Sequence, residues 1–282
     1  NAYIRQNFLD NVLRGGLPIA LGDIKPHSKP KIYHVFSRIH GDLERDYNFF
    51  NIETTYFSQG PGNFRDVNQN RRNDVIHSPV VGDFNVRMFL SFIQTDGYNP
   101  LTVSSTLFSI TPSKAEALYT SLGMNSTLKS KWVKMVSNGF RIGQLLKDMK
   151  ANGMHFPINR DDFVDRVVAA SDQTTAGIFA QNGFWTDHWT YTLDLIKSYL
   201  FVFPDKEVEM MYDADPIPFF MSPAVVKPRK LRYVLVDDPM VSDRKTVRVY
   251  NAVSIAGDPS FPSERAEALH RIYHDPRHVA GK

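Results

Sequence analysis

The chain has 282 residues, of which 42% are hydrophobic and 22% charged, and its formal net charge is +3 at pH 7. This composition is typical of a globular chain that can bury a substantial core, and it excludes a disordered or fibrous protein. The net charge is too small for a nucleic-acid footprint along the whole length, and no apolar run approaches a membrane span. The chain contains no cysteine, which excludes disulfide and thiolate chemistry and leads us to expect a cytoplasmic protein.

Apolar residues recur at helical spacing through most of the chain. In chain order, helices are expected over residues 3–13, 83–94, 128–136, 142–150 and 263–273, with three more that begin at Pro112, after Asn159 and near Asp187. Thr111 and Asn159 are typical N-caps, and Pro204 ends the helix that begins near Asp187. Short strands are expected at 32–36, 231–236 and 246–250.

Helices therefore outnumber strands, and we expect a mainly α fold with helix packed on helix and minor β structure toward the C-terminal end. Residues 1–282 are expected to form part of a single domain, with a β-containing excursion over 205–260. Polar loops at helix N-termini are expected to carry the functional residues, because loops at the ends of rigid elements commonly do so.

The segment 183–191 holds two of the three tryptophans, Trp185 and Trp189, with Asp187 between them. A sugar ring has an apolar face that stacks on indole, and a carboxyl group beside it can act on the glycosidic oxygen. The alternative is that both tryptophans are core residues one helical turn apart and that Asp187 lies at the N-cap or in the first turn. These residues alone leave both interpretations open.

A second polar segment, 63–74, follows a glycine- and proline-rich turn. Its candidate site residues are Arg65, Asp66, Gln69, Arg71, Arg72 and Asp74. Arginine binds carboxylates, phosphate or neighbouring hydroxyls at two points, and side-chain amides both donate and accept hydrogen bonds, as sugar hydroxyls require. Burying so many polar groups is costly, so we expect this segment to be a flexible loop by default. The alternative to a ligand-binding role is that these side chains form a salt-bridge and amide network that braces the loop.

Three histidines near the end of the sequence, His270, His274 and His278, have the spacing of metal ligands on a helix. They lack the acidic partner of a His-Glu-x-x-His arrangement, and we expect no metal site. The motifs for nucleotide phosphates, dinucleotides and a serine nucleophile are also missing from the sequence, so no organic cofactor is expected.

Several strings resemble the inverting glycoside phosphorylases. The string Gly-Asn-Phe-Arg-Asp-Val-Asn-Gln at 62–69 resembles the Gly-Tyr-Arg-Asp-x-x-Gln-Asp segment of the glycoside hydrolase family 94 cellobiose and chitobiose phosphorylases. Trp185-Thr186-Asp187 resembles their Trp-Asn-Asp, whose Asp is the general acid. The strings at 5–11, 43–48, 63–74 and 183–191 resemble more closely the β-1,3-glucan phosphorylases of families 149 and 161.

The resemblance implies a catalytic-domain fragment of a longer polypeptide, folded as part of an (α/α)6 barrel with the active site at one mouth. It implies inverting phosphorolysis of β-glucan oligosaccharides to glucose 1-phosphate, with Asp187 as the general acid and inorganic phosphate as the co-substrate. The phosphate ligands of these families come later in their sequences and have no counterpart before Lys282.

We expect the substrate-binding residues to be Arg65, Asp66, Gln69, Trp185, His188 and Trp189, and the phosphate-binding residues to be Arg71 and Arg72. An oligosaccharide and the remainder of a longer polypeptide are the expected partners, with no nucleic acid and no membrane. One alternative is an inverting hydrolase on the same barrel with Asp66 or Asp74 as the base, and the other is a non-catalytic carbohydrate-binding fragment. The oligomeric state stays open, a homodimer included.

Overall fold

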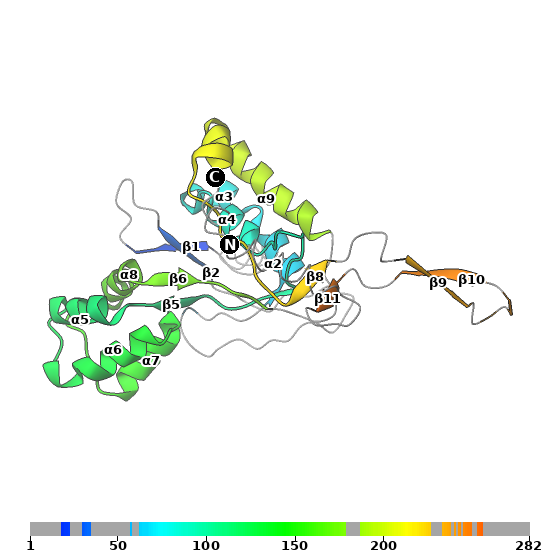
Figure 1. The fold of residues 1–282 in the computed structure, drawn as a ribbon. Coiled ribbons are helices and arrows are strands. Elements are labelled where there is room, and N and C mark those ends of the chain that lie inside the picture. The colour runs from blue at the N-terminus through cyan, green and yellow to red at the C-terminus, as the bar shows by residue number, and fades with distance from the viewer. Residues whose placement is uncertain are drawn as a thin grey trace, which may run out of the picture.

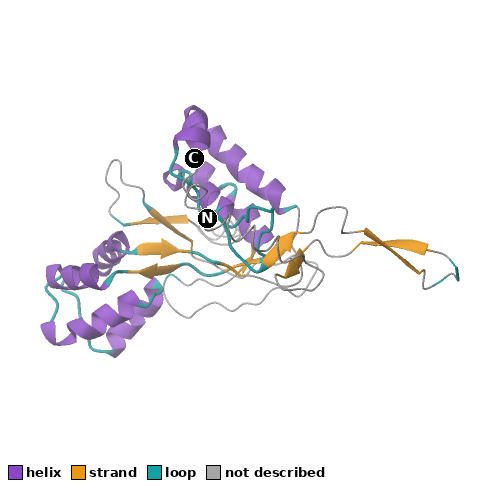
Figure 2. Ribbon diagram, in the orientation of Figure 1, coloured by secondary structure: helices purple, strands orange, loops and turns teal. Residues whose placement is uncertain are grey.

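The computed structural model describes residues 18–22, 30–34, 57, 62–178, 187–226, 233–237, 240, 242–243, 245–249 and 253–255. Helices make up most of the regular structure there and the strands are short, so the expected mainly α fold is confirmed. Figures 1 and 2 show two groups of helices on either side of a set of short strands. The helices expected at 3–13 and 263–273 lie outside the described residues.

The first group, which we call the apolar lobe, consists of four helices: α5 (Pro112–Ser121), α6 (Lys129–Ser137), α7 (Ile142–Ala151) and α8 (Arg160–Ala170). Their positions confirm the four predictions for this part of the chain. Trp132 is fully buried at the centre, where its ring lies 5.9 Å from that of Tyr119 and 6.0 Å from that of Phe163. Its Nε1 donates to the Ala115 carbonyl at 3.1 Å, so the core leaves this polar atom satisfied.

The second group, the polar lobe, consists of α2 (Phe64–Arg71), α3 (Asp74–His77), α4 (Phe84–Leu90) and α9 (His188–Val202). The prediction of a flexible loop over 63–74 is wrong, because most of this segment is helix α2. Phe64 and Val67 are buried in an apolar cluster shared with α4 and α9. This cluster anchors the helix, and several of its polar side chains are buried against neighbouring helices.

All strand pairs are antiparallel. β1 (Pro18–Leu21) pairs with β2 (Lys31–His34), and β5 (Leu107–Ser109) pairs with β6 (Asp172–Thr174). β3 (Gly62–Asn63), β4 (Thr102–Val103) and β7 (Gly177–Ile178) form a three-stranded sheet in that order. β8 (Ala224–Val226) pairs with β11 (Val253–Ile255), and β9 (Tyr233–Asp237) pairs with β10 (Lys245–Val249). Strands were expected at β2, β9 and β10; the shortest strands were not.

Strand β2 connects the two lobes, because successive side chains of a strand point to opposite faces. Tyr33 is buried in the core of the apolar lobe, with its ring 5.9 Å from that of Phe108. The next residue, His34, reaches Asp74 of α3 in the polar lobe, with 2.8 Å between Nε2 and the carboxylate. Within the described residues, no helix is both long enough and apolar enough to span a membrane.

Candidate active site

Helices α2 and α9 pack in parallel, with their N-termini at the same end. The Phe64 ring, at the start of α2, stacks on the His188 ring at the start of α9, with centroids 4.4 Å apart. One turn further along both helices, Asn68 Nδ2 donates to Thr192 Oγ1 at 3.1 Å. Because two positive helix ends meet at this point, an anion bound there is favoured.

Asp187 is the N-cap residue of α9, although its side chain makes no capping hydrogen bond. Its Oδ2 accepts a long hydrogen bond from the Tyr191 hydroxyl at 3.4 Å. Its Oδ1 is buried and has no hydrogen-bond partner among the described residues. One carboxylate oxygen is therefore held by Tyr191, and the other accepts no hydrogen bond from the described residues that would compete with a ligand.

The charged residues at the start of α2 lie beside this carboxylate. Arg65 Nε is 3.6 Å from Asp66 Oδ1, and Asp66 Oδ2 accepts from the side chain of Asn63 at 3.2 Å. The charges of Arg65 and Asp187 both act on the Tyr191 hydroxyl and on the His188 ring. We call this group, which consists of Arg65, Asp66, Asp187, His188 and Tyr191, the α2–α9 site.

His188 is a neutral, buried member of the α2–α9 site. Its Nδ1 lies 2.5 Å from Asn99 Oδ1, which fits a protonated Nδ1 that donates to the amide oxygen. Burial lowers the His188 pKa to about 4; Asp187 acts in the opposite direction and Arg65 lowers it further. Burial also raises the Tyr191 pKa, so its hydroxyl keeps its proton and remains a donor to Asp187.

Trp189 does not share a side of α9 with this site. It is 46% exposed, whereas the nearby His188 and Thr192 of the same helix are buried. Since each residue of a helix is rotated by about 100° from the one before, Trp189 is on the opposite side from Asp187 and Tyr191. Trp185 lies outside the described residues, so the expected pair of tryptophans around the acid stays a prediction.

Arg71, predicted to bind phosphate, is buried at the end of α2. It is 2% exposed and interacts electrostatically with Asp74, which is fully buried. Asp74 Oδ2 also accepts from Asn85 Nδ2 at 2.9 Å and contacts His34 Nε2 at 2.8 Å. This set of four side chains, which we call the buried polar cluster, braces α2, α3, α4 and β2, and its burial weighs against contact of Arg71 with a dissolved anion.

The buried polar cluster shifts two pKa values. Burial lowers the Arg71 pKa to about 10, although the charge of Asp74 opposes this shift. Burial and the neighbouring Arg71 also lower the His34 pKa to about 4, although the bond to Asp74 opposes this. A neutral His34 that donates to Asp74 leaves one positive and one negative charge in the cluster, which is the arrangement that burial favours.

Arg72 and Gln69 have more exposed positions on α2. Arg72 is half-exposed, and its guanidinium lies 3.6 Å from the carboxylate of Asp194 in α9. Gln69 is half-buried, one turn along α2 from Arg65 and Asp66. Sequence reasoning missed the partners His34, Asn85 and Asn99, because nothing in their local sequence indicates long-range contacts.

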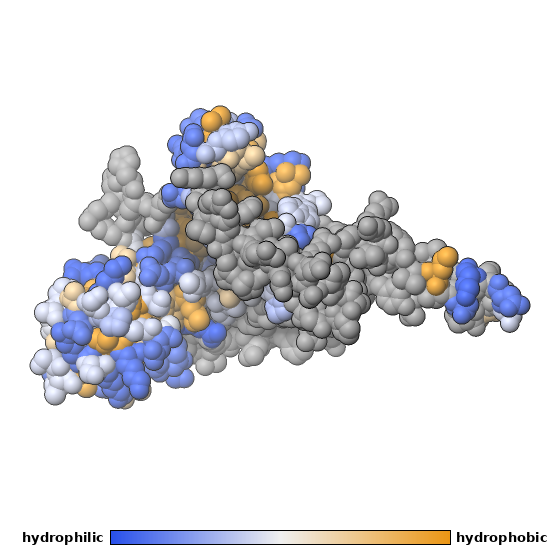
Figure 3. All heavy atoms as spheres, viewed as in Figure 1, coloured by the Kyte–Doolittle hydropathy of each residue, from blue (hydrophilic) through white to orange (hydrophobic). Residues whose placement is uncertain are grey.

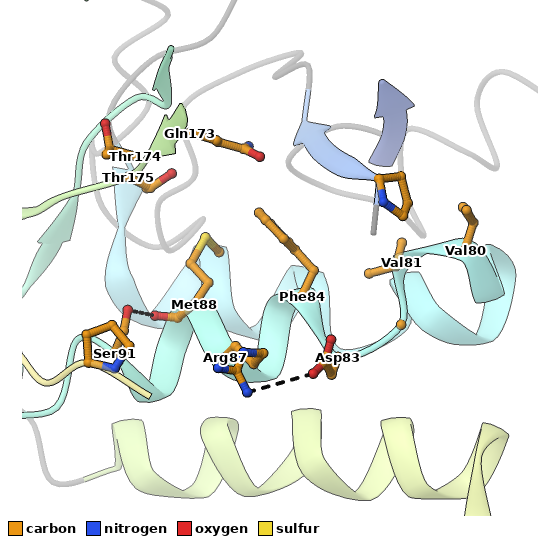
Figure 4. Close-up of a pocket in the computed structure, with 13 residues that line it drawn as sticks. Val80, Val81, Asp83, Phe84, Arg87, Met88, Ser91, Gln173, Thr174 and Thr175 are labelled. Atoms are coloured by element: carbon orange, nitrogen blue, oxygen red, sulfur yellow. Dashed lines mark hydrogen bonds and ion pairs between the residues drawn. The ribbon is translucent and has the colours of Figure 1, made fainter. Parts of the chain in front are cut away.

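A separate cavity of about 520 Å³ lies on the side of α4 that faces β6. Phe84 and Met88 point from α4 toward Thr174 and Thr175, as Figure 4 shows. Its polar side chains are largely engaged in the protein: the Thr175 hydroxyl is 2.7 Å from that of Thr106, for example. None of the residues of the α2–α9 site lines this cavity, so the two features are separate.

No cluster of three or more His, Asp or Glu side chains in the described part of the chain is placed to bind a metal ion. The histidines His270, His274 and His278 lie outside it. The chain matches no protein-family model, no curated protein and no solved structure.

Proposed function

We propose that this chain is part of the catalytic domain of an inverting glycoside phosphorylase that acts on β-glucan oligosaccharides. In this proposal the helices of the polar lobe belong to one mouth of an (α/α)6 barrel, and a longer cytoplasmic polypeptide supplies the remaining helices and the rest of the phosphate pocket. The supporting observation is the meeting of two distant segments: the start of α2, which carries Arg65 and Asp66, packs against the start of α9, which carries Asp187, with the Phe64 and His188 rings 4.4 Å apart.

Phosphorolysis needs one acid and one bound anion. Asp187 gives a proton to the glycosidic oxygen while the bond from that oxygen to the anomeric carbon breaks. A phosphate oxygen attacks the same carbon from the opposite face, which yields glucose 1-phosphate and the shortened oligosaccharide with inverted configuration. Tyr191 holds Asp187 Oδ2, so Oδ1 is the oxygen assigned to proton transfer.

The other residues of the α2–α9 site are assigned to binding. Arg65 and Asp66 bind the hydroxyls of the glucosyl unit, and Gln69 extends this polar row by one turn of α2. His188 positions the start of α9 through Asn99 and Phe64 and carries no charge near neutral pH. The two helix N-termini favour the phosphate anion. Arg72 is more exposed than Arg71, but it caps the other end of α2 and pairs with Asp194, so neither arginine is assigned to this anion.

An inverting hydrolase is the second candidate, because Asp66 belongs to the same site. A hydrolase needs a carboxylate base that activates water in addition to the acid. Asp74, the other base proposed from the sequence, is fully buried and paired in the buried polar cluster. Asp66 is therefore the residue to assign as base if water replaces phosphate.

The test measures products from laminari- and cello-oligosaccharides with and without inorganic phosphate. Phosphorolysis yields a sugar 1-phosphate only when phosphate is present, and Asp187→Asn lowers its rate by roughly 10²- to 10⁴-fold. Asp161→Asn is the matched control, because Asp161 is an exposed acid of the apolar lobe. Equal glucose release without phosphate would identify a hydrolase, and oligosaccharide binding without turnover would identify a binding fragment.

A further inference from the structure

The turn that follows α4 is closed by its own hydrogen bonds and places Asn99 beside α9. The Gln94 amide donates to the Tyr98 carbonyl at 2.7 Å, and the Tyr98 amide donates to Asp96 Oδ1 at 3.2 Å. Gly97 lies at the corner of this turn with φ at +92°, a conformation that glycine adopts without strain. Tyr98 and Asn99 are buried, so the turn holds the Asn99 side chain inside the protein.

Gln94 also ties this turn to β8 and to the residues that lead into it. Its Oε1 accepts from the Ser222 amide at 3.0 Å and from the Ser222 hydroxyl at 2.9 Å. Its Nε2 donates to the Ala224 carbonyl at 2.7 Å. Gln94 is 1% exposed, so these bonds are shielded from water. The turn, and Asn99 with it, is therefore held firmly against β8.

The side-chain amide of Asn99 decides which nitrogen of His188 carries the proton. Asn99 Nδ2 donates to the Gly97 carbonyl at 3.4 Å, and Asn99 Oδ1 lies 2.5 Å from His188 Nδ1. Burial keeps His188 neutral, with its pKa lowered to about 4, and a neutral imidazole has a single N–H. Because an amide oxygen only accepts, that proton lies on Nδ1, and Nε2 carries none.

The location of this proton matters because Asp187 is the next residue. The charge of Asp187 acts on the His188 ring, and Asp187 Oδ1 accepts no hydrogen bond from the described residues. An imidazole with its proton on Nε2 would be a donor beside this carboxyl group. A donated hydrogen bond stabilises a carboxylate over the carboxylic acid, and a general acid held as the carboxylate has no proton to give.

We propose that Asn99 is a positioning residue of the α2–α9 site, which binds the only ring proton of His188 and so prevents the ring from donating to Asp187. The inference deepens the proposed function and rests on it for the role of Asp187 as the general acid. The assignment of the ring proton does not depend on that role. Asn99 acts through His188 and is assigned no contact with the substrate or the reacting atoms.

The first experiment is a double-mutant cycle on the rate of phosphorolysis. Asn99→Leu removes the acceptor at similar side-chain size, so the ring proton moves to Nε2, and we expect kcat to fall by roughly 10- to 100-fold. In a His188→Phe background, where the ring has no such proton, we expect Asn99→Leu to change kcat by less than about 2-fold. An equal fall in both backgrounds would show that Asn99 only supports the fold, and it would overturn the proposal.

The matched control is Leu193→Ala, also on α9. Leu193 is 46% exposed, and Figure 3 shows hydrophobic residues at the surface of the polar lobe in the region of this helix. It belongs to neither the α2–α9 site nor the turn that carries Asn99. We expect Leu193→Ala to leave both kcat and the His188 ring unchanged, and a fall in kcat as large as that of Asn99→Leu would count against a specific role for Asn99.

The second experiment locates the ring proton directly, by ¹⁵N NMR of the imidazole nitrogens at pH 7. The His188 signals are those missing from His188→Phe. We expect the proton on Nδ1 in the unaltered protein and on Nε2 in Asn99→Leu. A proton on Nε2 in the unaltered protein, or a ring that Asn99→Leu leaves unchanged, would overturn the inference.

This measurement needs no substrate, so the two proposals fail separately. A protein with its proton on Nδ1 but no phosphorolysis would refute the proposed function. Phosphorolysis by a protein with its proton on Nε2 would refute the role of Asn99 alone.

Discussion

The two helical lobes bury different kinds of residue. The core of the apolar lobe is built from rings and aliphatic side chains around Trp132. Most of the buried charged, imidazole and amide side chains of the described residues lie in the polar lobe instead: Asp66, Asn68, Arg71, Asp74, Asn85 and His188. Burying polar groups adds little stability by itself, so the polar lobe depends on the pairing of these groups with one another.

This difference predicts how each lobe responds to change. The apolar lobe should depend on shape and volume and should be insensitive to pH. The stability of the polar lobe should depend on charge balance. Removing one partner of a buried pair should lower this stability, because the remaining polar group stays buried with one interaction fewer. Region-resolved hydrogen exchange can assign each effect to a lobe, because it reports local as well as global opening.

The largest expected effect is at Trp132. Trp132→Ala removes a fully buried ring and its hydrogen bond to Ala115, so we expect the free energy of unfolding to fall by roughly 3–5 kcal/mol. Chemical denaturation measures it, with Lys131→Ala, an exposed neighbour, as the control. A decrease in the free energy of unfolding below about 1 kcal/mol would mean that the Trp132 core contributes little to the stability of the apolar lobe.

The next largest effect concerns the two arginines at the end of α2. Asp74→Asn removes a negative charge that stabilises the buried Arg71, and we expect a loss of about 3 kcal/mol in the free energy of unfolding. Asp194→Asn is the matched control, because its partner Arg72 is largely exposed and such pairs contribute about 0–1 kcal/mol. Equal decreases in the free energy of unfolding for both variants would contradict the expectation that the buried Arg71–Asp74 pair contributes more stability than the exposed Arg72–Asp194 pair.

The sequence predicts the apolar lobe far better than the polar lobe. Its helices have clear apolar periodicity and local start signals, such as Pro112 for α5 and Asn159 for α8, and these signals need no distant partner. Segment 63–74 has only Phe64 and Val67 as apolar anchors, so its helix depends on contacts with α4 and α9. Local patterns do not contain those contacts, which is why a loop was predicted.

The candidate site was predictable in part for the same reason. Arg65 and Asp187 were chosen for their chemistry, and they lie together although more than a hundred residues separate them. The assignment of Arg71 and Arg72 to one task could not be tested from sequence, because adjacent residues of a helix face different surroundings. His34 and Asn99 have no distinctive neighbours in the sequence, and only the fold brings them to Asp74 and His188.

A smaller effect is expected from pH. Burial lowers the pKa values of His34 and His188 to about 4, from an ordinary value of 6.5. Arg71 lowers the first further and Arg65 the second, while Asp74 and Asp187 oppose the shift. The unfolded chain therefore binds more protons between pH 6.5 and 4, and stability is full above pH 6.5 and falls as the pH drops through this window. From pH 7 to 5 we expect a loss of about 2 kcal/mol for each histidine.

Urea unfolding at pH 7 and pH 5 measures this dependence. His34→Gln keeps a donor to Asp74 but cannot take up the extra proton, so it should reduce the pH dependence by about half. Hydrogen exchange at pH 5 should show increased opening in the polar lobe first. A protein equally stable at both values would show that these histidines are not neutral in the folded state.

The smallest expected effect is at the helix caps of the apolar lobe. Asn159 Oδ1 accepts from the Asp162 amide at 2.8 Å, so Asn159→Ala leaves one backbone donor of α8 without its partner. We expect a loss of about 1 kcal/mol in the free energy of unfolding, measured by urea denaturation. Thr111 occupies the same position before α5 but makes no side-chain capping bond, so Thr111→Ala should cost less. Equal losses of stability in the two variants would contradict this prediction. They would mean that the N-cap preference of Asn159 and Thr111 reflects backbone conformation and not the hydrogen bond seen at α8.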